Sequence, residues 1–145
     1  MRTFRYDPAM VQPMRDELTQ IGFEELLTPE TVDETLSTAD GSVLLVVNSV
    51  CGCAAGAARP GLRLALEHPT RPDRLTTVFA GMETDAVERA RSYFVGYPPS
   101  SPQMGLFKDG RLMYMLERQD IEGRPAEAIA ADLRAAFDQY CRVVP

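Results

Sequence analysis

The sequence lacks a long run of apolar residues. A membrane-spanning helix needs about 20 such residues in succession, whereas the longest apolar run here extends only from Val43 to Val47. The N-terminal segment MRTFRYDPAMVQPMRDEL carries charges throughout and has no apolar centre of the kind that a secretory signal requires. We therefore expect a cytoplasmic protein that does not contact a membrane.

Clustered positive charge is also missing. The chain has 15 Lys and Arg residues against 21 Asp and Glu residues, and its formal net charge is −6 at pH 7. A protein that binds nucleic acid needs grouped Lys and Arg side chains for the phosphates, and a negative protein is repelled by anionic lipids. We therefore expect neither nucleic acid nor membrane as a partner, and nothing in the sequence indicates a particular oligomeric state.

Cysteine is scarce. The chain contains Cys51, Cys53 and Cys141, an odd number that does not suit the disulfide framework of a small secreted protein. In a reducing cytoplasm, neighbouring cysteines more often serve catalysis, redox sensing or metal binding than structure. A chain of 145 residues can bury a hydrophobic core without cross-links, and we expect one domain over residues 1–145.

The hydrophobic pattern predicts alternating helices and strands. Helices are expected over residues 10–21, 29–38, 54–67, 84–96 and 124–141, and strands over 23–27, 42–48 and 75–81, with a hairpin over 103–116. Pro60 is expected to bend its helix and Thr84 to cap the next one. The alternation predicts an α/β fold with helices on both faces of a mixed sheet, and the strand over 42–48, apolar on both faces, is expected at its centre.

The segment Cys51-Gly52-Cys53 falls where the expected central strand meets the next helix. Chemistry gathers at the carboxyl ends of strands in open α/β sheets, and the free N–H groups of a helix N-terminus favour a thiolate. No Lys, Arg or His lies near Cys51 in sequence, so we expect its activation to come mainly from the helix end, unless the fold brings in a remote charge.

The spacing of the two cysteines also restricts their pairing. Residues i and i+2 of a helix point to nearly opposite sides. The two sulfurs can therefore pair only if Cys51 precedes the helix, with Gly52 in a backbone conformation closed to other residues. A ring this small is strained and easily reduced, which favours an isomerase or a single attacking thiol over a strong dithiol reductant.

Two other interpretations of the pair stay open. Cysteines pack as small hydrophobic residues and can be inert. A zinc or iron–sulfur site takes about four ligands, usually with two residues between paired cysteines, and the other soft ligands, Cys141 and His68, stand alone in the sequence. We therefore favour thiol chemistry without a bound metal, and we expect Cys141 to pack at the end of the last helix.

Pro102 stands at the entry to the hairpin, where a proline is a candidate for a cis peptide bond. A redox corner, a proline loop, a hairpin and a final helix follow one another in this chain. In this order the chain resembles the thioredoxin fold, a three-layer sandwich whose cis-proline loop faces the redox corner. The segments VNSVCGCAAGAARP, TVFAG, SSP and IEG together resemble the bacilliredoxin family over residues 10–141.

The resemblance implies a thiol–disulfide oxidoreductase that removes bacillithiol from S-bacillithiolated proteins. Cys51 would be the attacking thiolate and Cys53 the neighbouring thiol, and the adduct on Cys51 would be released either by Cys53 or by a second bacillithiol. Bacillithiol would be the thiol co-substrate, S-bacillithiolated proteins the partners, and no bound cofactor is implied. A protein disulfide isomerase is the nearest alternative, and a noncatalytic redox-sensing or metal-binding interaction module is an alternative from another class.

Substrate contacts are expected at Gly52, Ser101, Pro102 and Asn48. A cis Pro102 would hold the preceding backbone where its N–H and C=O groups can pair with an extended client. Asn48 has a second interpretation, in which its side chain satisfies the amides of the turn. Arg59 is expected on the surface, where it could attract the carboxylates of bacillithiol.

Overall fold

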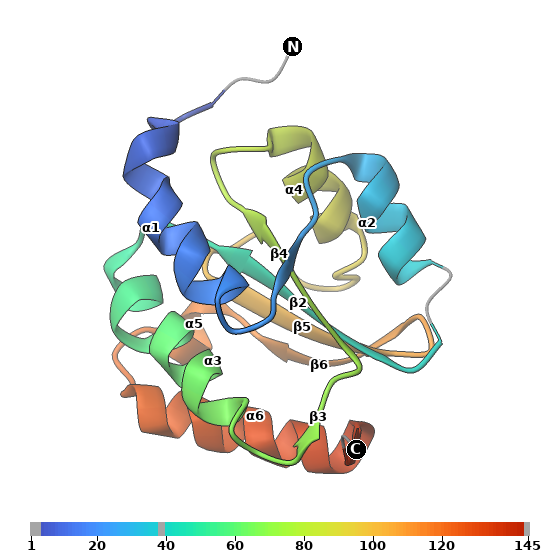
Figure 1. Cartoon of the computed structure of the whole chain (residues 1–145). Helices are drawn as coiled ribbons and strands as arrows, with labels where there is room; N and C mark the ends of the chain where they lie inside the picture. The colour runs from blue at the N-terminus through green and yellow to red at the C-terminus, as the bar shows by residue number, and fades with distance from the viewer. Residues whose placement is uncertain (1–3, 38–39, 144–145) are drawn as a thin grey trace.

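A five-stranded sheet forms the centre of the computed structural model, which describes residues 4–37 and 40–143 (Figure 1). The strand order is β1-β4-β2-β5-β6. Strands β1, β4 and β2 run parallel, whereas β5 is antiparallel to both β2 and β6. The bounds are β1 (Glu24–Glu25), β2 (Ser42–Asn48), β4 (Arg74–Phe79), β5 (Gln103–Lys108) and β6 (Arg111–Leu116). The mixed sheet with β2 at its centre confirms the expected arrangement.

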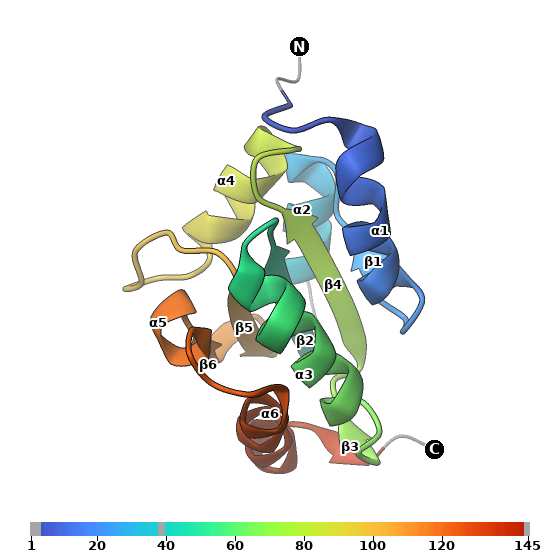
Figure 2. The ribbon, with the colours of Figure 1, turned by 90° about the vertical axis from the view of Figure 1, so that its left-hand side faces the viewer.

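Helices cover both faces of the sheet. Their bounds are α1 (Pro8–Thr19), α2 (Pro29–Leu36), η1 (Ala54–Ala58), α3 (Arg59–Ala65), α4 (Thr84–Ser92), α5 (Arg118–Ile121) and α6 (Ala126–Tyr140). Figure 1 shows α2 and α4 together on one side of the sheet and α3 and α6 on the other, and Figure 2 shows the same layers after a quarter turn. Among the described residues, no helix combines the length and the apolar character that crossing a membrane requires.

Strand β2 supplies core residues to both faces. Leu44 and Val46 pack with residues of α3 and α6, whereas Val43, Leu45 and Val47 pack with residues of α2 and α4. Successive side chains of a strand point to opposite faces, so a strand that is apolar at every position needs helices on both sides. The continuous apolar run therefore explains why the fold has three layers.

The hairpin between β5 and β6 turns where the sequence predicts. Asp109 and Gly110 both have positive φ, at 50° and 81°. A two-residue turn of this mirror-image type matches the right-handed twist of the flanking strands, and it favours Asp-Gly because glycine adopts positive φ without strain.

Several helix ends differ from the expected ones. Asp7 caps α1, which begins at Pro8 and ends at Thr19. Thr28 caps α2 as a capping box, and the expected end of that helix at Thr38 lies outside the described residues. Thr84 is the first residue of α4 and not its cap, because the cap position falls on Glu83.

Two features were not expected at all. Strands β3 (Thr70–Arg71) and β7 (Arg142–Val143) pair as a second small sheet near the end of α6. The short helix α5 follows β6 directly and contains Arg118. Their few residues give no recognisable periodicity, because a repeat needs more than one or two turns to show.

Pro60 coincides with a change of helix type. The five residues of η1 form a π-helical segment, and the ordinary α-helix begins at Arg59. Proline lacks the N–H group that an α-helix would direct at the carbonyl of Gly56, and its ring crowds that carbonyl. The wider π turn ahead of Pro60 removes this conflict, so the irregularity lies before the proline and next to the cysteine pair.

Candidate active site

Cys51 lies at the N-terminal end of the helix that follows β2. Its carbonyl oxygen accepts hydrogen bonds from the N–H groups of Ala54 and Ala55, at 3.0 and 3.2 Å. Its own N–H group donates to Ser49 Oγ at 3.1 Å. Cys51 therefore holds the position of a helix cap, where free backbone N–H groups gather. The expectation that Cys51 precedes the helix is confirmed.

Gly52 does not have the conformation that the sequence analysis expects. It lies in the first helical turn with Cys53 and is not among the described glycines with positive φ. The two sulfurs are nevertheless 2.7 Å apart, as free thiols. They meet because Cys51 lies outside the helical turn, so the rule for two helical residues does not apply to this pair.

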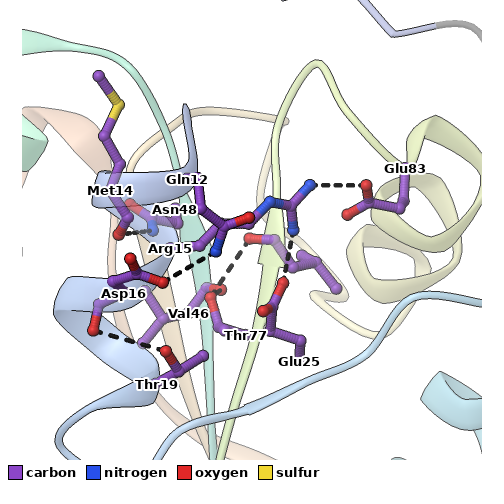
Figure 3. Close-up of polar contacts among 11 residues, drawn as sticks. Gln12, Met14, Arg15, Asp16, Thr19, Glu25, Val46, Asn48, Thr77 and Glu83 are labelled. Atoms are coloured by element: carbon purple, nitrogen blue, oxygen red, sulfur yellow. Dashed lines mark hydrogen bonds and ion pairs between the residues drawn. The ribbon is translucent and has the colours of Figure 1, made fainter. Parts of the chain in front are cut away.

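Asn48, Ser49 and Arg59 form a buried layer beneath the cysteine corner. The Asn48 side chain is 2% exposed, and its Oδ1 atom accepts hydrogen bonds from the N–H of Ser49 at 2.9 Å and from Arg59 Nη1 at 3.0 Å. Asn48 Nδ2 donates to the carbonyl of Met14 in α1 at 3.1 Å (Figure 3). Direct contact between Asn48 and substrate is therefore a wrong prediction; the side chain satisfies the groups of the turn.

The expectation for Arg59 is also wrong. Arg59 is 4% exposed, donates to the carbonyl of Ser49 at 2.9 Å, and pairs with Glu17 at 3.0 Å. Its charge is directed beneath the corner, so it cannot attract a carboxylate from solvent. The side chain instead holds the carbonyl of Ser49 directly, and it holds the amide of Ser49 through the Asn48 oxygen that both groups share.

The two cysteines have opposite pKa shifts. Burial acts to raise the pKa of Cys51, but a hydrogen bond from the Cys53 thiol, the N–H groups of Cys53 and Ala54, and the charge of Arg118 together lower this pKa below its ordinary value. Burial, the hydrogen bond to Cys51 and the negative charge of Cys51 raise the pKa of Cys53 to about 11. The pair therefore ionises at Cys51, while Cys53 stays protonated at neutral pH.

The proline loop lies against this corner. The Ser101–Pro102 peptide bond is cis, as the sequence analysis expects. Pro102 is buried, whereas Ser101 is half-buried and lines a pocket of about 590 Å³ together with Cys51 and Gly52. The structure thus brings three of the predicted site residues to one pocket, whereas Pro102 is buried and does not line it.

Arg118 is a residue of this pocket that the sequence analysis missed. Its Nη1 atom lies 3.4 Å from the carbonyl oxygen of Ser101, and its backbone N–H donates to Ser100 Oγ at 3.3 Å. Because Met104 pairs with Leu116 in the hairpin, the segments just before β5 and just after β6 lie side by side. The Asp109-Gly110 turn fixes which residues of the hairpin pair with each other. This register could therefore have predicted from the sequence that Arg118 lies near Pro102.

Cys141 lies away from this pocket. It lines a separate hollow with Ser42, the first residue of β2, whereas Cys51 follows the last residue of that strand. A strand of seven residues spans roughly 20 Å. Burial raises the pKa of Cys141, and its side chain packs against the main core cluster. Within the described part of the chain, no group of three or more His, Cys, Asp or Glu side chains is placed to bind a metal ion.

A nucleophilic thiol at a strand-to-helix corner, opposed by a cis-proline loop, defines a thiol–disulfide oxidoreductase of thioredoxin fold. Solved structures agree on the fold. A putative oxidoreductase with a thioredoxin fold superposes with a TM-score of 0.58 at 15% identity, covering 71% of this chain and 88% of that one. Thioredoxin from Fasciola hepatica gives a TM-score of 0.56 at 18% identity, covering 81% and 99%.

Sequence relatives give the family. Proteins named bacilliredoxin from Koribacter versatilis and Salinibacter ruber are both 54% identical to this chain; the matches cover 94% of this chain and 94% and 81% of theirs. The family model described as "Disulphide isomerase" matches residues 6–141. The chain belongs to the bacilliredoxin family.

Proposed function

We propose that the protein removes bacillithiol from S-bacillithiolated proteins by thiol–disulfide exchange at Cys51. The observation that carries the proposal is the difference between the two thiols: Cys51 has a lowered pKa and lines an open pocket, while the pKa of Cys53 beside it is raised to about 11. The thiolate is the attacking species in such exchange. Bacillithiol is the thiol co-substrate, the client proteins are the partners, no bound cofactor takes part, and the reaction belongs in the cytoplasm.

The first step is attack by the Cys51 thiolate on the sulfur that bacillithiol contributes to the mixed disulfide. A disulfide bond forms between Cys51 and bacillithiol, the original disulfide bond breaks, and the client leaves as a thiolate that takes a proton from water. Gly52 supports this step because nothing lies within 4 Å of the place where its side chain would be. The approach to Cys51 is open on that side.

The second step releases bacillithiol from Cys51. The Cys53 sulfur is 2.7 Å from that of Cys51, so Cys53 can lose its proton and attack the adduct, which forms the internal disulfide and expels bacillithiol. A second bacillithiol can instead attack the adduct and leave as oxidised bacillithiol. In either route each disulfide bond that breaks is replaced by one that forms.

The test uses a client with one bacillithiolated cysteine and mass spectrometry of both proteins. Cys51→Ser should leave the client modified. Cys53→Ser should release the client once and keep bacillithiol on Cys51. Activity in Cys51→Ser together with loss in Cys53→Ser would reverse the assigned roles.

Disulfide isomerase activity is the second candidate, because it needs the same attacking thiolate and the family description names it. Refolding of a scrambled disulfide protein tests it. An isomerase would restore native pairing without bacillithiol, whereas a protein that only removes bacillithiol would leave the scrambled pairs unchanged.

A further inference from the structure

The pocket beside Cys51 carries concentrated positive charge. Arg5, Arg91 and Arg118 all line it, and none of the described residues that line it carries a carboxylate. The chain as a whole has a net charge of −6, so this grouping runs against the overall charge. Guanidinium groups bind carboxylates through paired, charge-assisted hydrogen bonds. The pocket volume of about 590 Å³ falls in the range of about 300–1,000 Å³ that small-molecule sites occupy.

Arg91 has unused binding capacity. It lies at the end of α4 and is half-buried; its Nη2 atom donates to the carbonyl of Ser100 at 3.0 Å, while its buried Nε atom has no hydrogen-bond partner in the described structure. Burial lowers its pKa, which reflects the cost of holding this cation away from water. An anion in the pocket would offset that cost.

Arg5 is held at the edge of the same pocket by its backbone. Its N–H group donates to the carbonyl of Gly81 at 2.7 Å, and the ring of the adjacent Tyr6 packs against Gly81 so closely that a side chain there would collide with it. Gly81 has a φ of 89°, so both its conformation and its lack of a side chain serve this contact. The N-terminal segment is thereby fixed so that Arg5 lines the same pocket as Cys51.

Arg5 and Arg91 differ from arginines that are neutralised within the fold. Arg15, for example, lies between Glu25 and Glu83 at 2.6 and 2.7 Å, as Figure 3 shows. Arg118 pairs with Glu122 at 2.9 Å and directs its field at the cysteines. No ion pair to Arg5 or Arg91 occurs among residues 4–37 and 40–143.

We propose that Arg5 and Arg91 form a carboxylate-binding subsite that holds the acidic end of the small thiol while its sulfur meets Cys51. The proposal rests on the proposed function and adds the feature of the substrate that the pocket selects. The carboxylates take no part in bond making; the exchange of disulfide bonds is unchanged. Arg5 and Arg91 therefore determine specificity, and an anionic thiol is transferred faster than a neutral thiol of the same size.

The test compares two forms of one client, modified either with bacillithiol or with bacillithiol whose carboxylates are masked as methyl esters. The wild-type protein should process the anionic form at least about tenfold faster, a factor equivalent to about 1.4 kcal/mol. Arg91→Gln and, separately, Arg5→Gln should lower this ratio toward one, and Arg91→Lys should restore part of it. Arg5 is exposed, so Arg5→Gln tests the subsite even if Arg91→Gln fails to fold.

Arg63→Gln is the matched control. Arg63 is exposed in the last turn of α3 and does not line the pocket, so its removal changes the net charge equally and should leave the ratio at the wild-type value. Equal rates for the two substrates with the wild-type protein, or a ratio that both pocket variants leave unchanged, would overturn the subsite.

A binding measurement separates failure of the subsite from failure of the proposed function. Reduced bacillithiol is titrated into Cys51→Ser, and the amide NMR signals of Gly81 and Ser101 are followed. Shifts that Arg5→Gln abolishes, together with no release of bacillithiol from any client, would overturn the function and support the subsite. Release of bacillithiol from the client, without NMR shifts and without a preference for the anionic form, would support the proposed function and overturn the subsite.

Discussion

The guanidinium of Arg118, at the start of α5, helps to lower the pKa of Cys51: burial acts to raise this pKa, hydrogen bonds from Cys53 and Ala54 lower it, and the charge of Arg118 adds a smaller effect in the same direction. Removing this charge should therefore raise the pKa of Cys51 and reduce its thiolate fraction at neutral pH. We expect Arg118→Gln to slow alkylation of Cys51 at pH 7 by about twofold to threefold and to move its pH profile upward. Arg118→Lys, which keeps the charge, should stay close to the wild type. The measurement is the rate of alkylation by iodoacetamide as a function of pH, with peptide mapping to identify the labelled cysteine. An unchanged profile in Arg118→Gln would show that the charge of Arg118 does not affect the pKa of Cys51.

The cysteine pair should titrate in two separated steps. Cys51 should become reactive at lower pH than an ordinary thiol, because burial, which raises its pKa, is outweighed by hydrogen bonds from Cys53 and Ala54 and by the charge of Arg118. Cys53 should become reactive only as the pH approaches about 11. Thiolate fraction rises with pH, so at neutral pH alkylation should label Cys51 first.

Replacing Cys51 should change the titration of Cys53. Cys51→Ser removes the negative charge that helps to raise the pKa of Cys53, while burial, its largest cause, remains. The pKa of Cys53 should therefore fall but stay above the ordinary value. Alkylation of Cys51→Ser across pH 7–12 measures this shift, and a Cys53 profile that moves upward would contradict the coupling.

The buried layer beneath the corner should be important for stability. Asn48→Ala removes the side-chain partner of the Ser49 amide, and it removes one hydrogen bond each from the Met14 carbonyl and from Arg59 Nη1, which keeps only its bond to the Ser49 carbonyl. We expect a loss of about 2–4 kcal/mol in the free energy of unfolding, measured by urea denaturation. The Glu17 side chain is 44% exposed, so Glu17→Gln should cost less than about 1 kcal/mol. Equal losses in the two variants would show that burial does not decide the effect.

Two glycines on the same helical stretch should differ in their response to alanine. A side chain at Gly61 would lie 2.9 Å from Ile129 of α6, whereas nothing lies within 4 Å of the corresponding place at Gly56. Gly61→Ala should therefore destabilise the fold by about 1–3 kcal/mol. Gly56→Ala should change the stability by less than about 1 kcal/mol. Thermal unfolding of both variants provides the comparison, and a larger loss at Gly56 would contradict the close packing of α3 on α6.

Local patterns predicted the elements that position the site. The apolar run of β2, the Asp109-Gly110 turn and the place of Pro102 were recognisable because each depends on residues within a few positions. Gly52 was predicted less well. We expected an unusual backbone conformation at Gly52, whereas the two sulfurs approach because Cys51 lies outside the helical turn.

Arg59 and Arg118 show where local reasoning ends. Arg59 was expected on the surface, and Arg118 was not recognised as a residue of the site. Packing of α1 and α3 buries Arg59 beneath the cysteines, and pairing of β5 with β6 brings Arg118 beside the proline loop. Burial and charge fields depend on distances in space, which the order of residues does not state.

The order of residues alone predicted an α/β sheet with helices on both faces and a cysteine corner at the end of its central strand, because periodicity and turn chemistry act over short segments. That the proline loop faces this corner was implied by the resemblance to the thioredoxin fold. Folding in three dimensions decided which thiol ionises and which charges surround it. Those properties arise from hydrogen bonds, desolvation and Coulomb interactions between segments that are distant in sequence.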